Sequence, residues 1–360
     1  MADDIAIKVS NLYKIFGPND KAYVEPVQQG MSKSELLAQH QHVLGLKDIN
    51  IDMPKGAIQV VMGLSGSGKS TLIRHINRLI EPTAGEILIG EENVLQMSQK
   101  RLRDFRRHRV SMVFQRFALL PHKTVIDNVS YGLSITGVPK AKQRETSMYW
   151  IERVGLAGYE DNYPAQLSGG MQQRVGLARA LATDAEILLM DEAFSALDPL
   201  IRMDMQSVLL DLQKELHKTI VFITHDLDEA LRLGDKIAIL RDGEIVQQGT
   251  GQQIVLTPAD DYISAFVKEV NRGRVIQVET IMDVPDGPVV PEPNSVPVKR
   301  GTVIEEAAKR MSDAETTRAH VVDRETRQPV GLLTMRSIMA AMVMPLPSDA
   351  LSEEQLEALA

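Results

Sequence analysis

A glycine-rich loop that follows a continuous apolar run constrains the fold more than any other feature of the sequence. Residues 57–63, AIQVVMG, are typical of a strand buried on both faces of a sheet, and a helix-forming segment at about 69–79 comes after the loop. Similar apolar runs recur at 185–192 and 218–226, with an amphipathic segment at about 199–217 between them. Strands that alternate with helices predict an α/β fold with a largely parallel sheet covered on both faces.

Three other segments interrupt or extend this alternation. From about 121 to 182 the pattern is mostly helical, which predicts a helical subdomain inserted into the sheet domain. Residues 235–249, DKIAILRDGEIVQQG, predict a hairpin that turns at Asp-Gly. Residues 18–43 are mostly polar and hold one helix-like piece, for which Ser34 is the expected cap.

A change of character near residue 275 divides the chain, so residues 1–274 are predicted to form the first domain. The stretch 282–301 holds five prolines in twenty residues, and we predict a linker over 275–297. Residues 298–345 follow a helix–strand–strand–helix order. Residues 346–360 are an acidic tail, either a short helix or a frayed end.

Composition excludes several kinds of site and address. The 360-residue chain has no cysteine, which excludes disulfides and thiolate–metal sites. No apolar run approaches the roughly 20 residues that cross a bilayer, and the first residues lack the features of a signal peptide. We expect a cytosolic protein that reaches a membrane only through a partner.

Charge is distributed unevenly along the chain. The net charge is −8, and residues 275–360 hold 8 Lys/Arg against 14 Asp/Glu. A generic nucleic-acid binder usually carries a basic excess, so we expect no nucleic-acid partner. Residues 98–109, SQKRLRDFRRHR, are strongly basic and form either a patch for anionic partners or an exposed helix face, which we favour.

The loop at 63–70, GLSGSGKS, fits the GxxxxGK(S/T) pattern of a phosphate-binding loop between a strand and a helix. Glycines let the backbone N–H groups of such a loop turn inward onto phosphates. Lys69 then brings a positive charge to the β- and γ-phosphates, and Ser70 a hydroxyl to Mg²⁺. The predicted nucleotide-binding residues here are Gly63, Ser65, Gly66, Ser67, Gly68, Lys69, Ser70 and Thr71.

Polar side chains end the neighbouring apolar runs. Asp191 and Glu192 close ILLMDE, where two carboxylates are destabilising unless they serve a cation or a reaction. Asp191 is placed to hold Mg²⁺ through water, and Glu192 to polarise the attacking water. His225 ends VFITHD as an expected γ-phosphate contact, and the amide of Gln115 in MVFQRF is an expected contact of Mg²⁺ and the water.

These motifs occur in the order found in the ATP-binding-cassette (ABC) ATPases, which residues 5 to about 270 resemble. The order is the phosphate loop, the glutamine loop, LSGGMQQR, ILLMDE, SALD and THD. The resemblance implies ATP hydrolysis with Mg²⁺ on an α/β fold: a P-loop NTPase core with a mostly parallel sheet, an antiparallel β edge and a helical subdomain. The implied catalytic residues are Glu192, His225 and Gln115, and the implied metal ligands are Ser70, Gln115 and Asp191.

A second glycine-rich turn, LSGG at 167–170, begins a predicted helix whose N-terminus presents free N–H groups and partial positive charge. In the family that this chain resembles, two copies dock head to tail, and LSGG of one copy closes on the ATP held by the other. ATP binding therefore closes the dimer, and hydrolysis releases it. The residues that the resemblance places at this interface are Ser168, Gly169, Gly170, Gln172 and Asp198.

Two further contacts are implied by the resemblance. Phe16, just before Gly17, matches the aromatic residue that stacks on adenine; Tyr13 competes with it, core packing is the alternative for both, and we favour Phe16. The apolar-rich stretch RFALLPHKTVIDNV corresponds to the groove that receives the coupling helix of a membrane subunit. Its candidate contacts are Phe117, Leu119 and Leu120, for which plain subdomain packing is the alternative.

More of the sequence resembles the ATPase subunit of glycine betaine/proline-type osmolyte importers, including NRLIEPTAG, MVFQRFALLPH, LLMDEAFSALDPLIR and the insert at 18–43. This implies import of a quaternary amine such as glycine betaine, choline, proline betaine or trimethylamine N-oxide. The implied partners are a second copy, transmembrane permease subunits and, indirectly, a substrate-binding protein. The implied location is the cytoplasmic face of a bacterial plasma membrane, to which the chain binds peripherally.

A soluble ABC ATPase of DNA repair or translation is the alternative. Repair proteins of that kind separate the phosphate loop from LSGG with very long coiled coils, and translation factors carry two cassettes. Here Ser70 and Leu167 lie 97 positions apart and one cassette is present, which favours the importer.

Residues 298–342 resemble one cystathionine-β-synthase-type (CBS) repeat, a small C-terminal α+β region. Such repeats work in pairs, and only one is recognisable in this chain. We expect the two chains to pair their single repeats across the dimer, either as a sensor of ionic strength or a nucleotide or as a dimerisation clamp.

Overall fold

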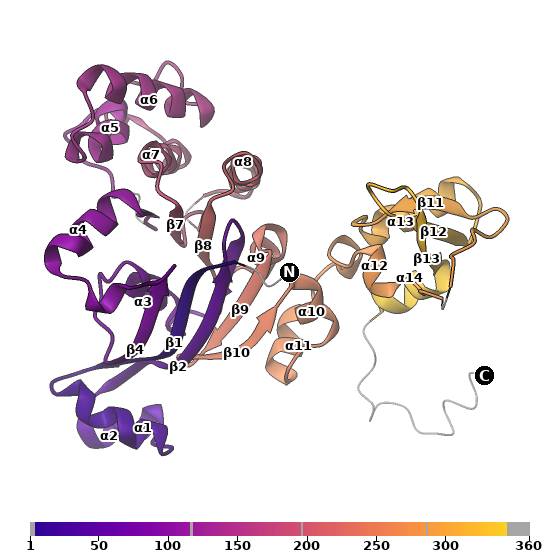
Figure 1. Cartoon of the computed structure of the whole chain (residues 1–360), viewed down its shortest axis with the longest axis horizontal. Coiled ribbons are helices and arrows are strands. Elements are labelled where there is room, and N and C mark those ends of the chain that lie inside the picture. The colour runs from indigo at the N-terminus through magenta and orange to yellow at the C-terminus, as the bar shows by residue number, and fades with distance from the viewer. Residues whose placement is uncertain (1–3, 116–117, 196, 286, 344–360) are drawn as a thin grey trace. The chain divides into compact units, whose positions relative to one another are not determined.

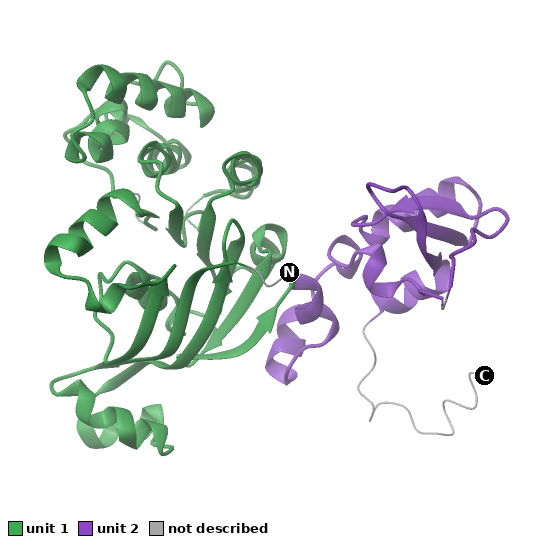
Figure 2. Cartoon of the chain, viewed as in Figure 1, with its two compact units in different colours: residues 1–250 green, residues 251–360 purple. Residues whose placement is uncertain are grey.

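The chain forms two compact units, residues 1–250 and 251–360 (Figure 2). The structure is a computed structural model that describes residues 4–115, 118–195, 197–285 and 287–343. Within these ranges every helix is either too short or too polar to cross a bilayer.

A six-stranded sheet forms the centre of the first unit (Figure 1). Its strands, in the order β10-β9-β3-β8-β7-β6, are Glu244–Gly249, Lys236–Arg241, Ile58–Met62, Thr219–Thr224, Ile187–Asp191 and Val110–Val113. All neighbours pair in parallel except β9 and β10. Every residue of β3, β7 and β8 is buried, as continuous apolar runs predict. The predicted α/β fold is confirmed.

An antiparallel sheet of the order β2-β1-β4-β5 packs on the first. Its strands are Val43–Pro54 (β2), Ile5–Phe16 (β1), Ala84–Ile89 (β4) and Glu92–Asn93 (β5). Ile7 and Leu12 of β1 share one buried cluster with Val61 of β3 and with Leu72 of helix α3. Helix α3, Lys69–Ile76, follows the phosphate loop, so both sheets anchor the helix that carries this loop.

The predicted hairpin turn braces the phosphate loop. Asp242 and Gly243 connect β9 to β10 with φ values of 51° and 89°, the two left-handed residues of a type I′ turn. The Gly243 N–H donates to the Ser67 carbonyl at 3.0 Å, and the Gly243 carbonyl accepts from the Lys47 N–H at 2.8 Å. The turn therefore joins β2 to the phosphate loop.

The other helices of the first unit lie around the sheets (Figure 1). They are α1 Val24–Gln28, α2 Lys33–His40, α4 Gln99–His108, α5 Val125–Ile135, α6 Lys140–Arg153, α7 Gly169–Ala182, α8 Pro199–Leu216 and α9 Leu227–Leu233. Helices α5, α6 and α7 pack on one another and follow β6 in the chain, where the helical subdomain was expected. Ser32, not Ser34, caps α2, because its hydroxyl and the Glu35 carboxylate form a reciprocal capping box.

The basic stretch at 98–109 is helix α4. Leu102 and Phe105 form its buried face. Arg106 donates to the carbonyl oxygens of Asn77 and Arg78 at 2.9 and 2.5 Å, at the end of α3. Part of the positive charge is therefore used inside the fold.

The second unit contains helices α10 (Gly251–Leu256), α11 (Asp261–Val267), α12 (Val278–Ile281), α13 (Ile304–Asp313) and α14 (Met335–Met342). Strands β11 (Val296–Lys299), β12 (Arg318–Val322) and β13 (Pro329–Thr334) form its sheet, parallel between β11 and β12 and antiparallel between β12 and β13. Ile276 and Val278, inside the segment predicted to be a linker, are fully buried in its core. The domain boundary at residue 274 stays a prediction, and the acidic tail at 346–360 lies outside the described residues.

His75 makes acid stability testable. It is 0% exposed in α3, and its Nδ1 lies 2.5 Å from the Thr71 carbonyl oxygen. Burial lowers the pKa of His75 from 6.5 to about 4, so only the unfolded chain binds a proton between these values. Stability is therefore full above pH 6.5 and should fall by about 3 kcal/mol as the pH drops to 4. Urea unfolding from pH 7 to pH 4 measures this loss.

The control for this titration is His108, an exposed histidine on α4. His75→Leu should flatten the pH dependence, whereas His108→Ala should leave it in place. An unaltered slope in His75→Leu would assign the loss of stability to other groups.

Candidate functional site

The phosphate loop adopts a conformation that requires glycine at defined points. Gly63 ends β3 with a φ of 152°, and a Cβ there would meet the Leu240 carbonyl oxygen at 2.2 Å. Gly66 and Gly68 are also left-handed, with φ values of 80° and 105°. This backbone leads into α3, whose first turn presents free N–H groups to an anion, while the Ser67 N–H donates to the Leu64 carbonyl oxygen at 3.2 Å within the loop.

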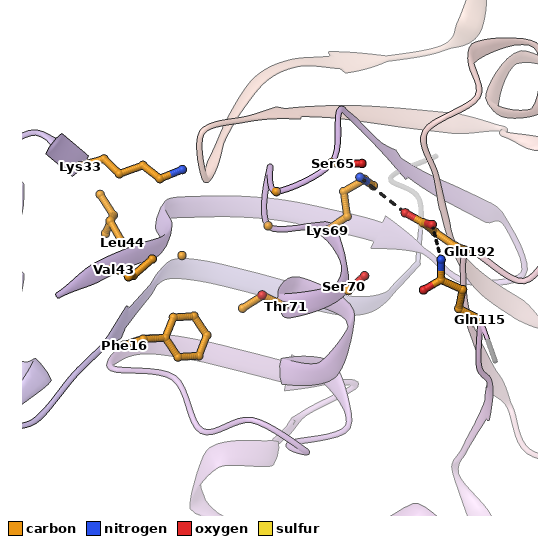
Figure 3. Close-up of a pocket in the computed structure, with 13 residues that line it drawn as sticks. Phe16, Lys33, Val43, Leu44, Ser65, Lys69, Ser70, Thr71, Gln115 and Glu192 are labelled. Atoms are coloured by element: carbon orange, nitrogen blue, oxygen red, sulfur yellow. Dashed lines mark hydrogen bonds and ion pairs between the residues drawn. The ribbon is translucent and has the colours of Figure 1, made fainter. Parts of the chain in front are cut away.

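A hollow of about 450 Å³ extends along this loop (Figure 3). One end is formed by Phe16 and Lys33 with Val43 and Leu44 of β2, and the opposite end by Gln115 and Glu192. The floor between them is lined by Gly45, Ser65, Gly66, Gly68, Lys69, Ser70 and Thr71. The hollow thus has an end with the apolar side chains of Phe16, Val43 and Leu44, a middle formed by the phosphate loop, and a polar end with Gln115 and Glu192.

Lys69 lies almost fully inside the site, at 4% exposure. Its ammonium donates to the carbonyl oxygens of Gly63 and Leu64 at 2.8 and 2.9 Å and lies 3.8 Å from Glu192 Oε1. Burial lowers the pKa of Lys69, while the carboxylates of Glu192 and Asp191 oppose that shift. The side chain is a fixed positive charge directed along the loop.

Ser70 and Asp191 meet beside the loop. Asp191 ends β7 at 2% exposure and accepts hydrogen bonds from Ser70 Oγ at 2.7 Å and from Arg74 Nη2 at 3.0 Å. A hydroxyl next to a carboxylate suits Mg²⁺, which prefers few protein oxygens together with water and phosphate. No cluster of three acidic or histidine ligands exists among the described residues.

Glu192 is the centre of the polar end (Figure 3). Its Oε2 accepts from Gln115 Nε2 at 2.9 Å and lies 3.7 Å from His225 Nδ1. Gln115, Glu192 and His225 follow β6, β7 and β8, whose carboxyl ends meet at one edge of the parallel sheet. The φ of Glu192 is 47°, a costly value for a non-glycine residue that is typical of functional positions.

LSGG lies elsewhere in the chain. Ser168 caps α7 by accepting from the Met171 N–H, and Gly169 begins the helix at the surface. Gln172 donates to the carbonyl oxygens of Pro164 and Leu167 at 3.0 and 3.2 Å. None of the LSGG residues lines the hollow at the phosphate loop. One chain therefore does not bring its two glycine-rich turns together.

Asp198 and Phe16, two of the predicted binding residues, are both exposed to solvent. Asp198 is exposed and caps α8 by accepting from the Ile201 N–H at 3.0 Å. Phe16 is 40% exposed and lines the hollow, whereas Tyr13 is 5% exposed and packs with Ile15 in a buried cluster. Of the two aromatic candidates, only Phe16 offers a ring face to a ligand.

A second hollow of about 270 Å³ is lined by residues of β6 and by Phe114, just before Gln115, and neither Leu119 nor Leu120 lines it. Leu79, Met112, Phe114 and Ile135 line it, with Arg106 and Arg107. Leu119 and Leu120 are half-buried, and the Leu120 backbone is bonded to Asn128 in both directions. Phe117 lies outside the described residues.

Sequence reasoning missed Arg74, beside the first hollow, and several residues that line it, among them Lys33. Arg74 contacts Asp191, and Lys33 comes from the polar insert to within 3.5 Å of Asp242 Oδ1. Arg74 lies five residues after Lys69 on the same helix, which is a weak signal. Nothing in the local sequence distinguishes Lys33 from other exposed lysines.

Comparison with known families and structures agrees with this geometry. The family model described as ABC transporter matches residues 46–195, and the CBS domain model matches residues 286–344. The dimeric structure of MJ0796, a bacterial ABC transporter cassette, matches with a TM-score of 0.59 and 31% identity over 68% of this chain and 98% of the cassette. A post-hydrolysis dimer of the same cassette with ADP and Pi matches with the same TM-score and 30% identity over the same shares of the two chains.

Similar proteins extend over nearly the whole chain. The glycine betaine/proline betaine transport system ATP-binding protein of Escherichia coli is 44% identical over 96% of this chain and 85% of its own length. The glycine betaine transport ATP-binding protein of Bacillus subtilis is 52% identical over 77% of this chain, and the match spans 66% of that relative. A trimethylamine N-oxide transport system ATP-binding protein of Pelagibacter ubique is 43% identical over 91% of this chain and 94% of its own length.

Proposed function

This chain belongs to the ABC transporter ATPases, and we propose that it powers an importer of a quaternary-amine osmolyte, because its relatives include ATP-binding proteins of glycine betaine transport systems. The contact of Glu192 with Gln115 and Lys69 at the end of the phosphate loop carries the ATPase activity, and the relatives of glycine betaine and trimethylamine N-oxide transport systems support the substrate class. The substrate class is glycine betaine, choline, proline betaine or trimethylamine N-oxide. Helices α5 to α7 form a compact insert rather than a long coiled coil, so nothing favours a repair protein.

ATP fits the hollow with its base at the apolar end and its phosphates along the loop. Phe16 stacks on the adenine, the loop N–H groups and Lys69 hold the phosphates, and Thr71 lines the passage between them. Mg²⁺ would neutralise charge on the β- and γ-phosphates, and Ser70, Asp191 and Gln115 are the residues that would hold it. The pairing of Ser70 with Asp191 supports this assignment.

Hydrolysis uses the polar end of the hollow. Glu192 accepts a proton from the attacking water as general base, and the Gln115 amide holds the Glu192 carboxylate in place. His225, exposed beside Glu192, contacts the γ-phosphate and stabilises the charge that develops there. The carboxyl ends of β6, β7 and β8 bring Gln115, Glu192 and His225 together, which supports these three roles.

Phe16→Ala should weaken ATP binding about tenfold, because base stacking on an aromatic ring contributes roughly 1–3 kcal/mol. Equilibrium titration with a fluorescent ATP analogue measures this loss. Tyr13→Phe is the matched control, since Tyr13 is buried away from the hollow. ATP affinity that is unchanged in Phe16→Ala would remove Phe16 from the base site.

In the proposed dimer, the LSGG turn that completes each nucleotide site comes from the other copy of the chain. Ser168, Gly169, Gly170 and Gln172 would cap the γ-phosphate held by the partner, and Asp198 would lie on the same interface. The N-terminus of α7 suits this role because it presents free N–H groups and partial positive charge. The separation of LSGG from the phosphate loop within one chain supports the dimer.

The remaining partners are transmembrane permease subunits and, through them, a substrate-binding protein, so the chain would act at the cytoplasmic face of the plasma membrane. The hollow beside Phe114 is the proposed contact with the permease. Its apolar lining with Arg106 and Arg107 suits a short helix that carries an acidic residue. The single CBS domain would pair with that of the second copy.

Transport by the purified complex tests the proposal. Membranes should yield the chain together with permease subunits, and vesicles containing this complex should accumulate at least one of the four quaternary amines only when ATP is supplied. Removal of residues 280–360 tests whether the CBS pair regulates transport, through the salt dependence of uptake. ATPase activity with uptake of none of these amines would reject the substrate class.

A further inference from the structure

Helices α8 and α9 begin directly after two loops of the site. Asp198 precedes α8 and Asp226, next to His225, precedes α9. Each aspartate caps its helix, through the Ile201 N–H and the Glu229 N–H, at 3.0 Å in both cases. The direction of each loop is therefore fixed by the helix that it enters.

Arg202, one turn into α8, contacts both loops. Its Nη1 donates to Asp226 Oδ2 at 3.1 Å, and its Nη2 donates to the Leu197 carbonyl oxygen at 3.2 Å. Asp226 is held further because its N–H donates to Thr224 Oγ1 at 3.0 Å. One guanidinium thus links the residue before Asp198 to the residue after His225.

Arg202 makes both loop contacts while one of its own N–H donors is left unpaired among the described residues. Arg202 Nε is buried and has no hydrogen-bond partner in the described part of the chain. A buried unpaired donor costs about 1–3 kcal/mol, whereas hydrogen bonds between charged groups are the stronger kind. The side chain keeps both loop contacts although its third donor stays unpaired.

A second polar contact holds the same two helices together. Gln206 of α8 donates to the buried carboxylate of Glu229 in α9 at 3.0 Å, and Arg232 of α9 donates to Gln206 Oε1 at 3.0 Å. The two helices are therefore also joined at Gln206, about one turn beyond Arg202.

We propose that Arg202 is a positioning residue that couples the loop of Leu197 and Asp198 to the loop of His225. Contact of Asp198 with the second subunit would fix Leu197, and Arg202 would then hold Asp226 so that His225 faces the γ-phosphate. The inference rests on the proposed function, in which Asp198 lies on the dimer interface and His225 contacts ATP. Arg202 itself touches neither ATP nor water in this scheme.

Kinetics of Arg202→Ala and Arg202→Lys test the coupling. Misplacement of a catalytic group by about 1 Å can cost 10²-fold, so Arg202→Ala should lower kcat between about 10-fold and 100-fold. The Kd for ATP should stay within about twofold, because no contact with the nucleotide is lost. Arg202→Lys should recover part of kcat, since one ammonium keeps the charge but lacks the planar fork that reaches two acceptors.

Two further variants separate coupling from simple stability. Arg153→Ala is the matched control, because it removes another arginine–carboxylate pair, between Arg153 of α6 and Glu215 at the end of α8 that lies far from both loops. Its kcat should be unchanged. Asp226→Asn should lower kcat like Arg202→Ala, and the double variant should be no worse than the poorer single variant.

The outcomes distinguish the inference from the proposed function. Unchanged kcat in Arg202→Ala, a parallel rise in Kd, or fully additive losses in the double variant would overturn the coupling role. If Arg202→Ala does not fold, Arg202→Lys and Asp226→Asn are decided by the same criteria. Wild-type protein that binds but never hydrolyses ATP would instead overturn the function on which the inference rests.

Discussion

Glu192→Gln should reduce kcat for ATP hydrolysis by between about 10²- and 10⁴-fold, the usual contribution of a general base. Glutamine keeps the size of the side chain and its contact with Gln115, but it cannot accept the proton of the attacking water. ATP binding should remain, because Glu192 lies beyond the loop that holds the phosphates. Steady-state phosphate release measures the loss of turnover.

The same variant should accumulate as a closed dimer with ATP inside, since the γ-phosphate that bridges two subunits is no longer removed. Size-exclusion chromatography should show a larger fraction of dimer with ATP than with ADP. Glu186→Gln is the matched control. Glu186 lies just before the first residue of β7, at the other end of the strand from Glu192, and pairs with Arg109. Full turnover in Glu192→Gln would exclude the role of general base.

Lys69→Ala should raise the Kd for ATP by about 10²-fold or more, because charge-assisted hydrogen bonds contribute about 1.5–3 kcal/mol each. The alanine also leaves the carbonyl oxygens of Gly63 and Leu64 without their donor, which loosens the loop itself. Calorimetric titration of ATP measures the affinity. Lys55→Ala is the control, since Lys55 is an exposed lysine paired with Asp4 away from the hollow.

The two variants should combine in a defined order. Lys69→Ala with Glu192→Gln should behave like Lys69→Ala alone, with neither ATP binding nor a closed dimer, because binding precedes closure. An ATP-dependent dimer in the double variant would show that Lys69 is dispensable for productive binding.

The sequence predicts the centre of the fold because its signals are local. Strands β3, β7 and β8 are buried at every residue and largely apolar, and parallel strands buried on both faces require such runs. Asp191 and His225 follow two of these strands, so sheet topology alone brings them to one edge. The turn at Asp242 and Gly243 is equally readable, because few residue pairs accept two left-handed conformations.

Contacts between distant segments could not be predicted. Arg202 of α8 contacts Asp226 at the start of α9, and Lys33 of the polar insert contacts Asp242. No sequence pattern relates the two residues of either pair. Ser34 was expected to cap α2, but Ser32 does so because only its spacing to Glu35 completes a reciprocal pair. The five prolines at 282–301 predict a linker over 275–297, whereas Ile276 and Val278 are fully buried because they pack on core residues farther along the chain, which no local pattern relates to them.

The β9–β10 hairpin has a mechanical consequence. Gly243 is hydrogen-bonded to Ser67 in the phosphate loop, and β10 then runs for six residues to Gly249, next to the end of the first unit at Thr250. Strand β10 thus leads from the residue next to the second unit to the hairpin turn, and one backbone hydrogen bond joins that turn to the phosphate loop. A shift of this strand would act on the Ser67 backbone through that hydrogen bond.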